Sequence, residues 1–145
     1  MKYILIVLAL FATASLFWFC KHTRYTAQNF PTRQLRWGKG GGITGMEVMY
    51  AMAENGQVIK SEGRALPVLL DDVKRKKARG IFEAAQMLEL QKIDFKHPGN
   101  TYSFIEMTDS TGNHRVSWGA ADFPVDSKIQ DIYQQLNSLI GPDKK

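Results

Sequence analysis

The chain is poor in the residues that most often build cross-links and metal sites. Its 145 residues include one cysteine, Cys20, and three histidines. A single cysteine excludes an internal disulfide framework and a cluster of thiolate ligands. The histidines, His22, His97 and His114, lack metal-ligand spacing, and none lies in an H-E-x-x-H pattern. We therefore expect packing alone to stabilise the fold, and we predict no metal and no other cofactor.

Signatures of catalysis and of nucleotide binding are also missing or out of context. The sequence contains no G-x-x-x-x-G-K-[ST] motif. Residues 40–45 match G-x-G-x-x-G in form, but a dinucleotide site needs an apolar strand before the glycines and a helix after them. Here the weakly apolar Leu35-Arg36-Trp37 precedes the glycines, and a strand-like pattern follows them. We predict no catalytic residues.

The glycine-rich segment itself admits two interpretations. It is a flexible or bulged connection between strands, where glycine permits a positive φ. Alternatively, a ligand or peptide approaches bare backbone there, and the candidate ligand-binding residues are then Gly40, Gly41, Gly42 and Thr44.

We expect the first twenty residues to form a membrane segment. Tyr3 to Cys20 carry no charge, and as a helix these residues would span roughly 27 Å, close to the thickness of a bilayer core. Three interpretations stay open. The segment is a signal peptide cleaved after Ala14, a lipoprotein signal with the lipid on Cys20, or an uncleaved anchor with Trp18 and Phe19 at the interface. We favour the anchor.

Positive charge follows this segment directly. No acidic residue lies between positions 21 and 39, whereas all 14 acidic residues lie beyond position 40. The basic residues of this stretch, which we expect at the membrane surface, are Lys21, Arg24, Arg33, Arg36 and Lys39. This distribution predicts attraction to anionic lipid and not nucleic-acid binding, which needs a basic face on the folded domain.

The side of the membrane is less clearly marked. Basic residues after a span favour a cytoplasmic domain, but a short polar head before an apolar run is typical of exported proteins. We favour export, which makes the partners a membrane lipid and an envelope protein. The domains are then 1–20 (anchor or signal), 21–33 (a basic tether ending near Pro31) and 34–145 (a small folded domain).

Hydropathy patterns predict the elements of that domain. Strands are expected at 35–37, stopped by Gly38, at 44–53 and at 58–62, with Asn55-Gly56 forming a type I′ turn. A helix is expected to open at Asp71 and Asp72 and to run to about residue 90. Strands at 102–108 and 115–118 and a helix over 129–140 follow, the latter capped by Asp126 or Ser127.

This order, β-β-β-α-β-β-α, predicts an α+β fold. We expect a single antiparallel sheet of about five strands with both helices packed on one face.

The run Lys74 to Arg79 is the densest charge in the chain. We interpret it as a solvated helix face, partly compensated by the i,i+4 pairs Asp71–Arg75, Asp72–Lys76 and Arg79–Glu83. The functional alternative is contact with anionic headgroups or with an acidic partner.

The layout resembles small uncharacterised bacterial envelope proteins. The residues that carry the resemblance are Trp37 to Gly45, Tyr50, Asn55-Gly56 and Pro98 to Tyr102. The chain departs from that pattern where Ile43 replaces an aromatic residue and where Phe19 precedes the cysteine. The resemblance implies fold and location and no activity. We expect a membrane-tethered, non-enzymatic binding module; the alternative is a small enzyme or a phosphate-binding module that uses residues 38–45.

Overall fold

The computed structural model describes residues 24–141. The predictions for residues 1–20, for lipidation at Cys20 and for Lys21 therefore lie outside the described residues. Among the residues that are described, no helix is both long and apolar enough to cross a membrane.

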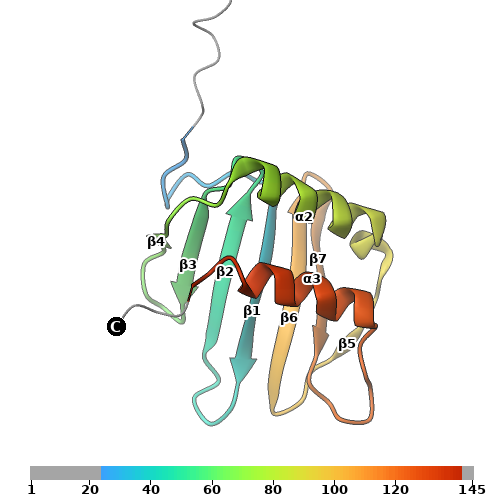
Figure 1. The fold of residues 1–145 in the computed structure, drawn as a ribbon. Coiled ribbons are helices and arrows are strands. Elements are labelled where there is room, and N and C mark those ends of the chain that lie inside the picture. Colours follow the sequence, from blue (N-terminus) through green and yellow to red (C-terminus); the bar gives the residue numbers. More distant parts are fainter. Residues whose placement is uncertain (1–23, 142–145) are drawn as a thin grey trace, which may run out of the picture.

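One seven-stranded sheet forms the centre of the domain, in the order β4-β3-β2-β1-β6-β7-β5 (Figure 1). Its strands are β1 (Gln34–Gly41), β2 (Glu47–Ala53), β3 (Val58–Glu62), β4 (Val68–Leu69), β5 (Lys96–His97), β6 (Thr101–Asp109) and β7 (Gly112–Trp118). All neighbouring pairs are antiparallel except β5 with β7. The five predicted strands are the five long ones; β4 and β5 have two residues each, too few to show a period.

Two helices, α2 (Arg75–Met87) and α3 (Ser127–Asn137), cover one face of the sheet (Figure 1), and a short 3₁₀ turn, η1 (Leu90–Lys92), follows α2. The α+β class and the single sheet with two helices are confirmed. Alternate residues of the five long strands, such as Leu35 and Trp37 in β1, face the helix-covered core, because side chains alternate between the two faces of a strand. The fully buried Leu136 of α3 belongs to the same core.

The prediction that Gly38 stops the first strand is wrong. β1 continues through Gly38 and Gly40 to Gly41. A Cβ atom on Gly38 would lie 2.0 Å from the Val48 carbonyl oxygen, and one on Gly40 would lie 2.7 Å from the Tyr102 hydroxyl. These glycines allow neighbouring groups to approach the strand closely and do not end it.

The β2–β3 turn also differs from the prediction. A type I′ turn needs a positive φ at both Asn55 and Gly56, but among the described residues other than glycine only Glu89 has one. Gly56 has a φ of 95° and donates its N–H to the Ala53 carbonyl at 2.9 Å. The connection is therefore a three-residue loop in which only the last residue is left-handed.

The first helix begins at Arg75, four residues later than predicted. The backbone N–H of Leu70 donates to the Val58 carbonyl, and that of Val73 donates to the Gly56 carbonyl at 2.8 Å. These bonds hold residues 70–73 against the β2–β3 hairpin, so the two aspartates cannot form the first turn of a helix.

The second helix agrees better with the prediction. The Asp126 carboxylate caps α3 by accepting the Lys128 backbone N–H at 2.8 Å, as expected for a residue with a short acceptor side chain. The helix ends at Asn137, slightly before the predicted end.

We predict that Leu136→Ala lowers the free energy of unfolding by about 2–5 kcal/mol, because it removes a fully buried side chain and leaves a cavity. The same change at the exposed Leu66 is the control and should cost less than about 0.5 kcal/mol. Urea unfolding of the two variants makes the comparison. Equal losses would mean that α3 does not pack on the sheet as described.

Candidate functional site

A row of four side chains crosses the sheet at the end near the β1–β2 hairpin. In the strand register Trp118 lies opposite Ser103, Ser103 opposite Lys39, and Lys39 opposite Val48. The row is on the helix-covered face, because Lys39 is two residues from the core residue Trp37. Helix α3 borders it through Tyr133, whose ring meets the Trp118 ring edge-on at a centroid distance of 5.1 Å.

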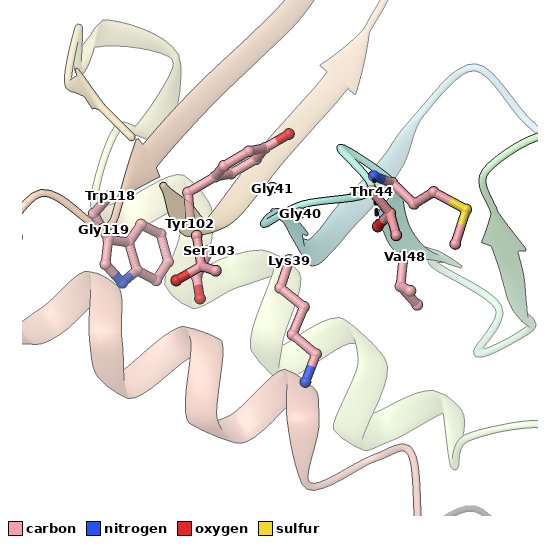
Figure 2. Close-up of a pocket in the computed structure, with 11 residues that line it drawn as sticks. Lys39, Gly40, Gly41, Thr44, Val48, Tyr102, Ser103, Trp118 and Gly119 are labelled. Atoms are coloured by element: carbon pink, nitrogen blue, oxygen red, sulfur yellow. Dashed lines mark hydrogen bonds between the residues drawn. The ribbon is translucent and has the colours of Figure 1, made fainter. Parts of the chain in front are cut away.

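This row lines a pocket of about 510 Å³ (Figure 2). The residues around it are Lys39, Gly40, Gly41, Thr44, Met46, Val48, Thr101, Tyr102, Ser103, Trp118 and Gly119. It thus combines one cationic group and several hydroxyl groups with an indole and aliphatic side chains. Such a mixture of apolar wall and few polar groups is typical of binding pockets.

Three of the four ligand-binding candidates from the sequence line this pocket: Gly40, Gly41 and Thr44. The fourth, Gly42, does not, and its N–H donates to the Asn100 carbonyl at 2.7 Å. Gly41 has a φ of 92°, and a Cβ atom there would lie 2.2 Å from the same carbonyl oxygen. The fold therefore requires these glycines whether or not a ligand binds.

The basic residues predicted at the membrane surface are not gathered on one patch. Arg24 pairs with Asp72, and Arg33 pairs with Glu54 at 3.2 Å. Arg36 points to the opposite face of the sheet from Lys39, because the two are three residues apart on one strand. Lys39 makes no hydrogen bond or ion pair with any residue in the range 24–141.

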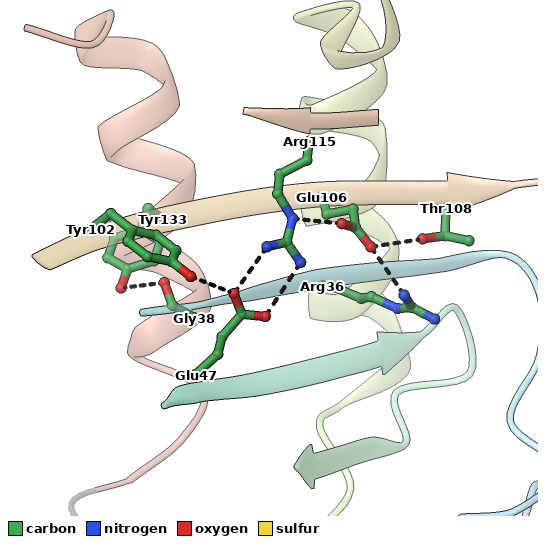
Figure 3. Close-up of polar contacts among 8 residues, drawn as sticks. All are labelled: Arg36, Gly38, Glu47, Tyr102, Glu106, Thr108, Arg115 and Tyr133. Atoms are coloured by element: carbon green, nitrogen blue, oxygen red, sulfur yellow. Dashed lines mark hydrogen bonds and ion pairs between the residues drawn. The ribbon is translucent and has the colours of Figure 1, made fainter. Parts of the chain in front are cut away.

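An ion-pair network, which the sequence did not reveal, spans the sheet face that the helices leave uncovered (Figure 3). Arg36 donates to Glu106 at 3.0 Å, and Arg115 donates to the other Glu106 oxygen at 2.7 Å. Arg115 also reaches Glu47 at 2.9 Å. Arg36, Glu106 and Arg115 are direct cross-strand neighbours on β1, β6 and β7, so the signal becomes visible only once the register is known.

The network covers an aromatic side chain. Phe104 is 0% exposed although it lies on the face without helices, and the Arg115 guanidinium carbon lies 4.0 Å from the centre of its ring. This is the geometry of a cation–π contact. The ion pairs thus do on this face what the helices do on the other, which is to keep water from an apolar side chain.

Tyr102 belongs to both the pocket and the network. Its ring lies over Gly40, and its hydroxyl donates to the Glu47 carboxylate at 3.0 Å. Burial raises the pKa of the Tyr102 hydroxyl, and the hydrogen bond and negative charge of Glu47 raise it further, against the opposing charge of Arg115. The Tyr102 side chain thus lies on the face opposite Lys39, Ser103 and Trp118 (Figure 2), where Glu47 holds it across β1.

No protein-family model matches this chain, and no curated protein shows significant similarity to it. The resemblance to envelope proteins stays a prediction, and the site is assigned from its geometry. Within the part of the chain that the structure describes, no three His, Cys, Asp or Glu side chains come together as metal ligands would.

We predict that Tyr102 ionises above the usual range of a tyrosine. The folded state holds the Tyr102 proton more tightly than the unfolded chain, whose pKa is about 10. The resulting contribution to stability is present below that pH and is lost as the pH rises through the raised folded value. Absorbance at 295 nm should show a late phase that Tyr102→Phe removes and Glu47→Gln moves to lower pH. A late phase that survives Tyr102→Phe would contradict the assignment; Tyr25→Phe is the control.

Proposed function

We propose that this chain is a membrane-tethered envelope protein whose domain binds, without converting it, a ligand that joins an anionic group to an apolar one. The observation that carries the proposal is the ammonium group of Lys39, which pairs with no residue in the range 24–141. It lies in one row with Trp118 and Val48, at the edge of a pocket large enough for a small molecule or a short peptide segment.

The lining matches such a ligand group by group. Lys39 supplies a positive charge and three donors. The hydroxyl groups of Thr44, Thr101 and Ser103 offer both donors and acceptors. Trp118 presents an aromatic surface for an apolar moiety. A carboxylate beside an apolar side chain, as in an acidic or C-terminal peptide segment, satisfies all three kinds of group.

Exposed apolar side chains at the mouth of the pocket favour a peptide or a protein as the ligand. Ile43, at the tip of the β1–β2 hairpin, is fully exposed, and Met46 of the same hairpin is half exposed and lines the pocket. Exposed apolar side chains beside a binding pocket are typical of a contact surface. A hairpin loop on a rigid sheet is also where binding residues concentrate.

Binding is favoured over the alternative of a small enzyme or a phosphate-binding module. Among the residues that line the pocket, none is a carboxylate or an imidazole, so Ser103 lacks the partners of a Ser-His-Asp triad. The glycine-rich segment is followed by strand β2 and not by a helix, and the Gly42 N–H already donates to the Asn100 carbonyl. A phosphate would therefore lack the helix N-terminus on which a dinucleotide fingerprint depends.

We predict that the full-length protein binds 1-anilinonaphthalene-8-sulfonate, an anionic aromatic probe, in this pocket. Lys39→Gln should weaken binding by roughly fivefold to tenfold, because it removes the charge partner of the sulfonate. Lys128→Gln, an equal change of charge on α3 outside this pocket, is the control. Fluorescence titration measures both. Equal affinities of the two variants for the probe would contradict the assignment of its binding site to this pocket.

A further inference from the structure

The exposed side of the first turns of α2 is strongly basic. We call this the basic surface, and it consists of Lys74, Arg75, Lys76, Lys77 and Arg79, all exposed. None of these side chains forms an ion pair or hydrogen bond with another residue in the range 24–141.

The compensation expected from the sequence is missing. Asp71 and Asp72 lie outside the helix, and the Asp72 carboxylate forms an ion pair with Arg24. The first turn of α2 contains no acidic residue, and the cap residue Lys74 makes no side-chain cap bond. Cations at this end of a helix oppose its dipole. The cluster therefore lowers the stability of the isolated domain, which points to an anionic partner outside it.

The chain enters the domain beside this surface. Arg24 contacts Asp72, and the backbone of Tyr25 exchanges two hydrogen bonds with the side-chain amide of Gln57, at 2.7 and 3.1 Å. Residues 24 and 25 are thus fixed to the end of the sheet where α2 begins, and the chain leaves the described domain there (Figure 1).

The apolar segment ends only four residues before this point. The steps from Cys20 to Arg24 span at most about 14 Å, even fully extended. If residues 3–20 lie in a bilayer, the start of α2 lies close to the headgroup layer, where basic side chains are attracted to anionic lipid. The basic surface then faces lipid.

We propose that the basic surface docks the domain on anionic lipid headgroups and so holds the pocket away from the membrane. The pocket lies at the opposite end of β1, which runs from Gln34 to Gly41 and spans about 23 Å. The inference rests on the membrane anchoring in the proposed function, and it adds an orientation: α2 next to the lipid, and the β1–β2 hairpin pointing outward.

Energy transfer to the bilayer tests this orientation in the full-length protein. With Cys20→Ser removing the native thiol, a donor dye is attached at Gly80→Cys or at Ile43→Cys. Gly80 is exposed on α2 and a Cβ atom there meets nothing within 4 Å, while Ile43 is fully exposed at the hairpin tip. Vesicles of phosphatidylcholine, with or without phosphatidylglycerol, carry an acceptor lipid.

On anionic vesicles, transfer from position 80 should exceed transfer from position 43 at least about twofold, because α2 lies near the end of the sheet opposite the β1–β2 hairpin (Figure 1). The difference should vanish on neutral vesicles and in about 1 M salt, where screening shortens the Debye length to about 3 Å. The variant K74Q/K76Q/K77Q/R79Q should abolish it, whereas the control K92Q/K96Q/K128Q/R64Q, with the same loss of charge elsewhere, should keep it.

The outcomes separate the inference from the proposed function. Vesicle flotation of the same samples reports anchoring. Protein that floats but shows equal transfer from both positions, or an unchanged difference on neutral vesicles, overturns the docking and leaves the pocket assignment standing. Protein that does not float overturns both the anchor and the docking. If the basic surface binds an acidic protein and not lipid, the protein should float without the lipid-dependent difference in transfer.

Discussion

The central strand β1 determines both faces of this domain, because its side chains alternate between two different surroundings. Leu35 and Trp37 enter the core beneath the helices, and Lys39 continues the same face into the pocket. Arg36 begins the ion-pair network on the other face, where Gly38 and Gly40 leave room for close approach by groups of the neighbouring strands. A shift of one residue in the register of β1 would exchange these two sets of residues.

The ion-pair network has a structural role that two helices alone could not fill. A sheet with helices on one side leaves its other face to water, and Phe104 lies on that face. Arg115 and Glu106 cover its ring with charges that satisfy one another. Such buried pairs add little net stability, but removal of one partner is costly. Glu47 of the same network also holds the Tyr102 side chain over Gly40 on this face.

Elements with local signals could be predicted from the sequence. Helix α3 follows from its apolar period and its Asp126 cap, and the long strands follow from alternation. The start of α2 could not be predicted, because Val73 is bound by Gly56 of a distant hairpin. The turn at Asn55 differs from the predicted type I′ turn because three residues, and not two, connect the strands. Gly40, Gly41 and Thr44 of the segment singled out in the sequence line the pocket, but Trp118 and Lys39 reach it only through the pairing of β7, β6 and β1.

The proposal that the pocket beside the β1–β2 hairpin captures a partner is tested most directly by photo-crosslinking in intact cells. A photoreactive amino acid at Ile43, beside the pocket, is compared with one at Met87, another largely exposed apolar position, on α2. The account predicts a discrete adduct from position 43 that Lys39→Gln removes and Lys128→Gln preserves. The same adducts from both positions, or an adduct from position 43 that is indifferent to Lys39, would contradict it.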